Sequence, residues 1–93
     1  MLFLLNKTQP ATMHLLQLFG GNQEKDVLLV EDAVYYATSF MVEKFKSEGV
    51  ERVYALQDSI EERSLDPSAE VEVVDYDRIV DLLMEEYDKV VCI

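Results

Sequence analysis

The amino-acid sequence predicts an α/β fold of three layers, α/β/α, in which helices cover both faces of a mostly parallel, five-stranded sheet. Short apolar runs typical of buried strands alternate along the 93 residues with segments whose apolar side chains recur at helical spacing. The connections between these segments are short, as expected for right-handed crossovers between parallel strands. We therefore expect a single domain over residues 1–93.

The first half of the chain is predicted to contain two strand-and-helix units. Residues 2–5 are an unbroken apolar run, the pattern of a strand buried on both faces, and the helix after it ends at residues 20–22, Gly-Gly-Asn. Residues 27–30 form a second such run, which indicates a central position in the sheet. The next helix is predicted over residues 33–48, with Gly49 ending it.

Three further strands are predicted in the second half, at residues 53–56, 70–73 and 90–93. A short helical turn follows the first of these strands, and a helix capped by Asp75 follows the second. Residues 70–73 alternate polar and apolar side chains, so this strand should have one wet face and lie near the sheet edge. The last helix should bury one shared face, made of Tyr76, Ile79, Val80, Leu83 and Tyr87.

The net charge of the chain disfavours direct binding of nucleic acid, and we expect none. Nineteen acidic residues against eight basic ones give a formal charge of −11, and such a field repels phosphate backbones. The excess is uneven, because residues 51–93 hold thirteen acidic and four basic residues, whereas residues 1–50 hold six and four. We expect any electropositive partner to meet the second half of the chain.

The lack of targeting segments, the single cysteine and the lack of a phosphate-binding motif narrow the class of protein further. The apolar start, residues 1–5, is too short for a signal-peptide core, and no apolar run approaches membrane-spanning length. A single cysteine excludes an intrachain disulfide and a multi-cysteine metal site, which fits a reducing compartment. The sequence has no glycine-rich phosphate-binding loop, so we expect no nucleotide or other cofactor. A soluble cytoplasmic protein without a membrane partner is predicted.

Polar residues follow the predicted strands at the edge where parallel sheets bind ligands. The strand-end candidates are Asn6, Lys7, Asp32 and Asp58. One hypothesis is that the aspartates, with Asp75, converge on a magnesium-like ion, as in a small acidic-site, metal-binding or receiver-like domain. The other is that each aspartate caps the helix that follows it. We favour capping, because every one of these acids precedes a predicted helix.

Cys92 is a candidate thiol with two interpretations. A thiolate with a lowered pKa attacks sulfur readily, so Cys92 could be a nucleophile or a persulfide carrier. Its neighbours in residues 90–93 are apolar, and free cysteine is often buried as a small hydrophobe. We favour the second interpretation, an inert thiol buried in the last strand.

The helix predicted over residues 33–48 carries more apolar side chains than one stripe against a sheet requires. Tyr35, Tyr36 and Phe40 lie beyond that stripe, and Tyr36 and Phe40 should be one helical turn apart. Aromatic side chains are enriched at protein interfaces, so these three residues are candidates for a partner interface. An equally open alternative is that neighbouring elements of the same domain cover them.

Four segments of the chain, taken in order, are similar to those of a known family. Residues 1–8 with Pro10 resemble its opening strand followed by Asn-Lys-Ser-Pro-like residues, and residues 28–34 resemble its Leu-Leu-(Gln/Glu)-Asp-Gly-Val segment. Residues 53–58 resemble its Val-Tyr-Ala-Leu segment, and residues 75–82 its Asp-Tyr-x-x-Phe-Val-x-Leu helix start. By their order and spacing the chain resembles the DsrH/TusB family, small subunits of the DsrEFH and TusBCD sulfur-relay complexes.

This resemblance implies a DsrE-like fold, a cytoplasmic location, and a heterohexamer with DsrE/TusD-like and DsrF/TusC-like subunits that passes persulfide sulfur. The sulfur goes to 2-thiolation of the wobble uridine of tRNA in the Tus branch, and belongs to sulfur oxidation in the Dsr branch. Residues 11–19 lack the first-helix cysteine of some DsrH members, Ala33 replaces the usual glycine, and Cys92 is not at the family position. We therefore expect a noncatalytic or supporting subunit, with a homo-oligomer as the alternative assembly.

Overall fold

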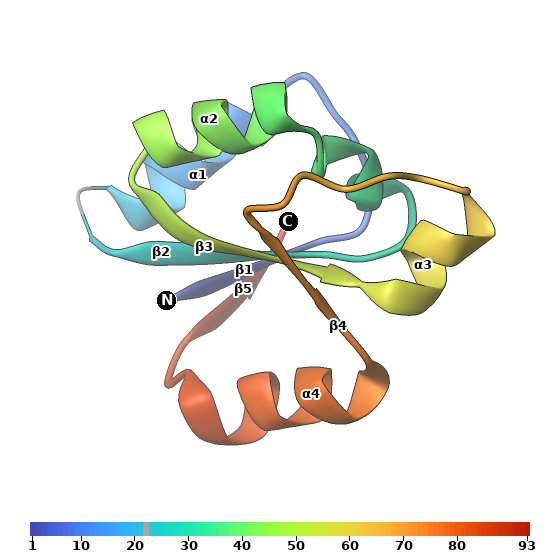
Figure 1. The fold of residues 1–93 in the computed structure, drawn as a ribbon. Helices are drawn as coiled ribbons and strands as arrows, with labels where there is room; N and C mark the ends of the chain where they lie inside the picture. The colour runs from blue at the N-terminus through green and yellow to red at the C-terminus, as the bar shows by residue number, and fades with distance from the viewer. Residues whose placement is uncertain (22) are drawn as a thin grey trace.

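A parallel sheet forms the middle layer of the molecule (Figure 1). The computed structural model describes residues 1–21 and 23–93, and within them the sheet has five strands in the order β4-β3-β2-β1-β5. Every neighbouring pair of these strands is parallel, which confirms the predicted fold class. Asn22, placed by the sequence at the end of the first helix, lies outside the described residues. The strands are β1 (Leu2–Leu5), β2 (Lys25–Leu29), β3 (Val50–Leu56), β4 (Val71–Val74) and β5 (Val90–Cys92).

One face of the sheet is covered by α1 (Thr12–Gly20) and α2 (Ser39–Ser47), which Figure 1 shows lying together. The 3-10 helix η1 (Glu31–Tyr36) joins β2 to α2. Side chains of alternate strand residues point to this face, as the pleat requires, and pack against the helices. The fully buried members of this cluster include Phe3, Val27, Leu29, Leu16 and Phe45.

The opposite face is covered by α4 (Tyr76–Asp81), which continues as the π-helix η2 (Leu82–Glu86) (Figure 1). The short helix α3 (Gln57–Glu62) follows directly on β3. A second apolar cluster fills this side of the sheet, made of Leu2, Leu28, Tyr54, Val74 and Leu82. The two clusters lie on opposite faces of one sheet, so the predicted three layers are observed. No helix in the part of the chain that the structure describes is long and apolar enough to cross a membrane.

The prediction of one helix over residues 33–48 is wrong. η1 ends at Tyr36, and α2 begins after Thr38, whose extended backbone (φ −87°, ψ 156°) makes it the N-cap. The Thr38 hydroxyl oxygen accepts a hydrogen bond from the Met41 backbone N–H at 3.3 Å. A threonine hydroxyl can hydrogen-bond a nearby backbone N–H and so end or start a helix. The break at Thr38 therefore places Tyr36 and Phe40 on different helices.

The predicted inner face of the last helix is also partly wrong. Tyr76 and Val80 are 58% and 56% exposed, whereas Leu82 is fully buried and Ile79 and Leu83 pack beside it. Ile79, Leu82 and Leu83 have i, i+3, i+4 spacing, which places their side chains on one side of a helix. The helix therefore turns this face to the sheet and leaves Tyr76 and Val80 outside.

Candidate functional site

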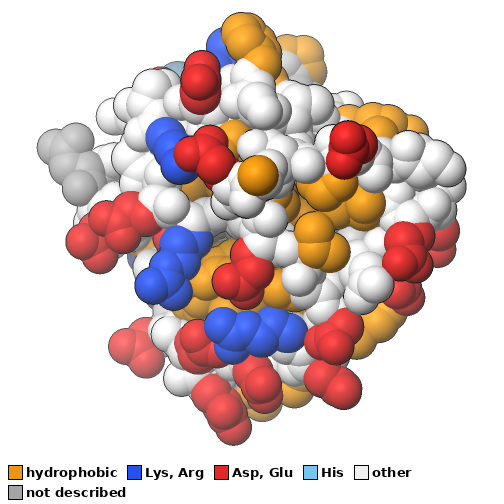
Figure 2. All heavy atoms as spheres, in the orientation of Figure 1, with side chains coloured by type: hydrophobic (Ala, Val, Ile, Leu, Met, Phe, Trp, Pro, Cys, Tyr) orange, Lys and Arg blue, Asp and Glu red, His pale blue; other side chains and the backbone are white. Residues whose placement is uncertain are grey.

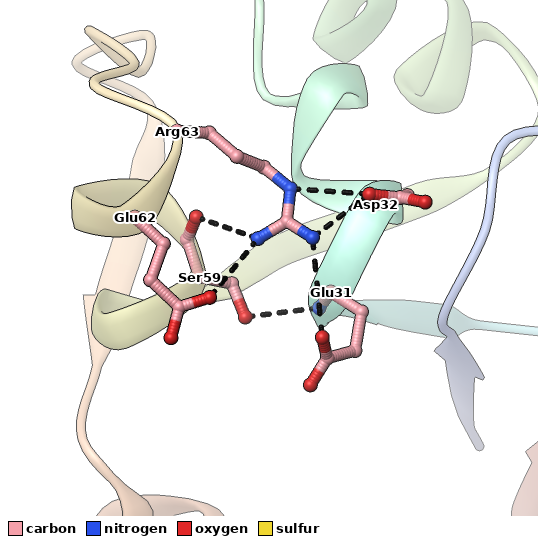
Figure 3. Close-up of polar contacts among 5 residues, drawn as sticks. All are labelled: Glu31, Asp32, Ser59, Glu62 and Arg63. Atoms are coloured by element: carbon pink, nitrogen blue, oxygen red, sulfur yellow. Dashed lines mark hydrogen bonds and ion pairs between the residues drawn. The ribbon is translucent and has the colours of Figure 1, made fainter.

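An ionic cluster centred on Arg63 lies just beyond the carboxyl ends of β2 and β3 (Figure 3). Arg63 Nε and Nη2 donate to one oxygen of Asp32, at 3.2 and 2.8 Å. Carboxylate oxygens of Glu31 and Glu62 lie 3.9 and 3.6 Å from the two terminal nitrogens. The Arg63 side chain is only 17% exposed, whereas these three acidic side chains are 63% to 69% exposed. The cluster thus ties η1 to the residue that follows α3.

Ser59 completes the cluster from inside the fold (Figure 3). Its buried hydroxyl accepts a hydrogen bond from the Glu31 backbone N–H at 2.9 Å, and its carbonyl oxygen accepts one from Arg63 Nη1 at 3.1 Å. Glu31 has φ +50°, a left-handed conformation that is unfavourable for a residue with a Cβ. The hydrogen bond from the Glu31 backbone N–H to the Ser59 hydroxyl holds the chain in this conformation at Glu31.

Electrostatics keep the Arg63 guanidinium charged and engaged. Its hydrogen bonds with Asp32 raise the pKa of Arg63 above the ordinary value, and the carboxylates of Asp32 and Glu31 add to the effect by their charge. The guanidinium also lies 6.0 Å from the ring centroid of Tyr35. A cation held by two segments and an aromatic face acts as a clamp between them, and its donors are directed at protein oxygens.

The capping prediction is correct for Asp75 and wrong for Asp32 and Asp58. Asp75 Oδ1 accepts a hydrogen bond from the Arg78 backbone N–H at 2.8 Å at the start of α4. Asp32 lies inside η1 and binds Arg63, and Asp58 lies inside the first turn of α3, whose N-cap position is Leu56. η1 begins at Glu31 and α3 begins at Gln57, so each helix starts one residue before the aspartate that was expected to cap it.

The hypothesis of a magnesium-like ion finds no cluster to hold it. Among residues 1–21 and 23–93, no group of three or more His, Cys, Asp or Glu side chains is placed to bind a metal ion. Asp32 is engaged by Arg63, and Asp75 is engaged by the start of α4. Asp32 and Asp75 therefore have separate partners within the chain.

A depression of about 490 Å³ at the carboxyl ends of β1, β2 and β5 brings together three of the sequence candidates, Asn6, Lys7 and Cys92. Asn6 and Lys7 are exposed where β1 ends. Cys92 is exposed as well, so the prediction of a buried cysteine is wrong. β5 is the outer strand of the sheet and pairs with β1 at its inner side, which leaves its side chains less covered than those of a central strand. That Cys92 is inert stays a prediction.

The three aromatic candidates separate into two kinds. Tyr35 and Phe40 are 49% and 66% exposed, and Lys44 Nζ lies 4.9 Å from the Phe40 ring centroid. Tyr36 instead makes contacts inside the chain. Its hydroxyl accepts the Gln9 backbone N–H at 2.9 Å and donates to the Gln9 carbonyl oxygen at 3.1 Å, and its ring lies edge-on against Phe45 at 5.7 Å. Of the three rings, Tyr35 and Phe40 are therefore exposed, and Tyr36 is bound within the chain.

Lys25 is a structural cation that the sequence analysis missed. Its side chain is only 2% exposed, and Nζ donates hydrogen bonds of 2.8 Å to the carbonyl oxygens of Gly21 and Glu48. These carbonyls end α1 and α2, where a positive charge also suits the helix dipoles. The available signal was a lysine opening an apolar strand, between two helix-ending glycines.

A second feature that the sequence did not indicate is a hydrogen-bonded group of side chains, which joins the amino end of the sheet to the end of η2. The Tyr87 hydroxyl donates to Asp26 Oδ2 and lies 3.3 Å from the Tyr54 hydroxyl, and the Arg52 backbone N–H donates to Asp26 Oδ1 at 2.9 Å. Burial raises the pKa of Tyr87 above its ordinary value, and the hydrogen bond to Asp26 raises it further. These residues come from three segments that are far apart in sequence, β2, β3 and the end of η2, so no local pattern indicates the group.

These features define a class of small three-layer α/β proteins with an all-parallel sheet. The crystal structure of the ychN protein from E. coli is similar in fold, with a TM-score of 0.70, 16% identity, and coverage of 99% of this chain and 97% of that chain. Residues 9–90 match the model of the family described as DsrH like protein, and the chain belongs to this DsrH family. A search of curated proteins finds no match to the sequence.

Proposed function

We propose that the protein is a noncatalytic or supporting subunit of a cytoplasmic sulfur-relay complex. The observation that carries this proposal is the match of residues 9–90 to the DsrH family. Membership of this family associates the chain with multi-subunit complexes that pass persulfide sulfur. The two pathways in question are 2-thiolation of the tRNA wobble uridine and sulfur oxidation.

The supporting role rests on where thiols are found. Residues 11–19, which contain most of α1, hold no cysteine, and the single thiol of the chain is on the outer strand β5. A relay needs a thiol that forms a persulfide and gives up its outer sulfur to the next thiol. We assign that thiol to a partner, and we assign to this chain part of the surface on which the partners assemble.

The proposed assembly surface is formed by Tyr35 and Phe40. Both rings are about half exposed or more, and both have a cation nearby, Arg63 for Tyr35 and Lys44 for Phe40. Exposed aromatic rings with adjacent cations are typical of residues that carry binding energy in protein interfaces. The partners are DsrE/TusD-like and DsrF/TusC-like subunits in a heterohexamer. With a formal charge of −11, this subunit would not contact nucleic acid directly.

Coexpression with a DsrE-like and a DsrF-like subunit tests the proposal. We expect all three chains to copurify and to give a single complex by size exclusion with light scattering. Phe40→Asp places a charge in the proposed interface and should lower the yield of the complex by about tenfold. Leu18→Asp, a matched change of an α1 residue that is 64% exposed and belongs to neither proposed binding surface, should leave the yield unchanged.

Two outcomes would contradict this assignment. If the chain only self-associates in the presence of both partners, the heterohexamer is wrong and a homo-oligomer replaces it. If Phe40→Asp assembles as well as the unmodified chain, the interface does not include α2.

A further inference from the structure

The outer face of the last helix carries an apolar stripe that the fold does not use. Tyr76, Val80 and Met84 follow one another at intervals of four residues along α4 and η2, and they are 58%, 56% and 79% exposed. The inner face of the same helix already supplies Leu82 to the core. At the ordinary rise of a helix the stripe is about 12 Å long, or two turns. The stripe is therefore long enough to contact about two turns of a partner helix.

Acidic side chains run beside this stripe with the same spacing. Asp77, Asp81 and Glu85 each follow one of the apolar residues and are exposed. Residues 75–88 hold six acidic residues and one basic residue, Arg78. Arg78 is itself engaged within the chain, by a hydrogen-bonded ion pair with Glu86 and a longer one with Glu72 at 3.8 Å. Figure 2 shows acidic side chains gathered over the lower part of the molecule, where Figure 1 places α4.

We propose that the outer face of α4 and η2 docks a cationic amphipathic helix of a protein partner. The stripe of Tyr76, Val80 and Met84 would contact apolar residues spaced one turn apart, and Asp77, Asp81 and Glu85 would pair with lysine or arginine beside them. In this kind of recognition the partner helix makes its apolar contacts through residues at positions i, i+3, i+4 and i+7. Charge complementarity of this kind sets partner choice and speeds association.

The acidic charge of this face disfavours other binding partners. A second copy of this chain would bring its own acidic stripe against this one, and like charges at an interface are strongly unfavourable. Nucleic acid and anionic lipid are repelled for the same reason. A cationic protein segment is the occupant that both the apolar stripe and the acidic stripe favour.

This surface is separate from the one proposed for subunit assembly. α2, which carries Phe40, lies on the opposite face of the sheet from α4 (Figure 1). A change at Phe40 should therefore affect assembly and leave binding at α4 intact, and changes at Val80 and Met84 should do the reverse. The two proposals can fail independently.

A synthetic peptide of about 18 residues, built from leucine and lysine in an amphipathic helical pattern, is the probe. Two comparison peptides keep one property each: leucine with glutamate retains the apolar stripe, and serine with lysine retains the charge. Isothermal calorimetry gives the Kd, and amide NMR of the unmodified full chain locates the peptide. We expect only the leucine–lysine peptide to bind tightly, with amide shifts concentrated at residues 76–88.

Matched variants then test the stripe itself. Val80→Ser with Met84→Ser should raise the Kd about tenfold, whereas Leu18→Ser with Phe19→Ser, apolar residues of α1 that are also more than half exposed, should leave it within about twofold. Circular dichroism checks that each variant is folded, and the NMR map needs no variant. The proposal is overturned if the serine–lysine peptide binds as tightly, if the shifts centre elsewhere, or if the α1 variant weakens binding as much. Self-association of the free chain that Val80→Ser with Met84→Ser abolishes would assign the face to a second copy instead.

Discussion

Lys25 holds the ends of α1 and α2 together through one buried ammonium group. Its stem passes Gly20, where an added Cβ would come within 2.4 Å of the Lys25 side chain. Nζ then reaches the two carbonyl oxygens, of Gly21 and Glu48, that end the helices. A buried charge is tolerated in this way because hydrogen bonds and helix dipoles replace the water it has lost.

Replacing Lys25 by methionine should therefore destabilise the fold strongly. Lys25→Met keeps most of the apolar stem but leaves two carbonyl groups without their donor, and we expect the free energy of unfolding to fall by about 2 to 4 kcal/mol. Urea denaturation measures the change. Lys46→Met is the control, because the exposed Lys46–Glu70 pair at 2.8 Å should contribute about 1 kcal/mol or less. Equal losses in the two variants would show that Lys25 has no special role.

Tyr87 should make stability depend on pH in the alkaline range. Burial and the hydrogen bond to Asp26 raise its pKa in the folded chain, so the folded state keeps the proton longer than the unfolded state. The stabilisation is complete below about pH 10, the pKa of an unfolded tyrosine, and it is lost as the pH rises above that value. Comparing urea denaturation near pH 8 and about pH 11 should give a smaller fall for Tyr87→Phe than for the unmodified chain. The same fall in both, with Tyr76→Phe as the exposed control, would exclude Tyr87 as the cause.

Among the elements, the strands were predictable and the helices were less so. Residues 2–5 and 27–30 are short, uninterrupted apolar runs that end at polar residues, and this length and setting favour a buried strand over a buried helix. The helix over residues 33–48 was mispredicted because its apolar spacing runs through Thr38, whose hydroxyl caps a new helix. The spacing of apolar residues indicates which side chains could lie on one face of a helix. It does not indicate a local hydrogen bond, such as that of Thr38, that ends one helix and begins another.

The break at Thr38 leads to a prediction for α2. Thr38→Ala removes the hydroxyl that accepts the Met41 N–H, and the loss of an N-cap should lower the free energy of unfolding by about 1 kcal/mol. Thr8→Ala, in the exposed segment between β1 and α1, is the matched control and should change little. Thermal and urea denaturation would both record the difference. A loss at Thr8 as large as at Thr38 would mean that the cap does not hold α2.

The candidate site was harder to predict than the fold, for a related reason. Asp32 and Arg63 are 31 positions apart, and nothing local in the sequence indicates that they pair. The Cys92 prediction failed because an apolar neighbourhood was taken to mean burial, whereas the strand order places β5 at the edge of the sheet. Asn6 and Lys7 were correctly placed at a strand end, since that follows from the first apolar run alone.

In the whole molecule, the sheet separates two surfaces with different chemistry. α1 and α2 cover one face of the sheet and α4 covers the other (Figure 1). On the first side Phe40 is exposed with Lys44 nearby, and on the second the exposed Tyr76, Val80 and Met84 lie beside acidic residues. The uneven charge of the two halves of the sequence thus becomes a difference between sides, because α4 belongs to the acidic second half. The two proposed binding surfaces therefore lie on opposite sides of the sheet.

We propose that this chain supports sulfur transfer without carrying the sulfur itself. The most direct test of this proposal is the rate of sulfur transfer from a labelled persulfide donor through the complex reconstituted with its DsrE-like and DsrF-like partners. Omitting the chain should stop assembly, and Cys92→Ser should leave the rate within about twofold of the unmodified complex, because the persulfide forms on a partner's thiol. A loss of transfer in an otherwise intact Cys92→Ser complex would make Cys92 a sulfur carrier and would rule out a purely supporting role for this chain.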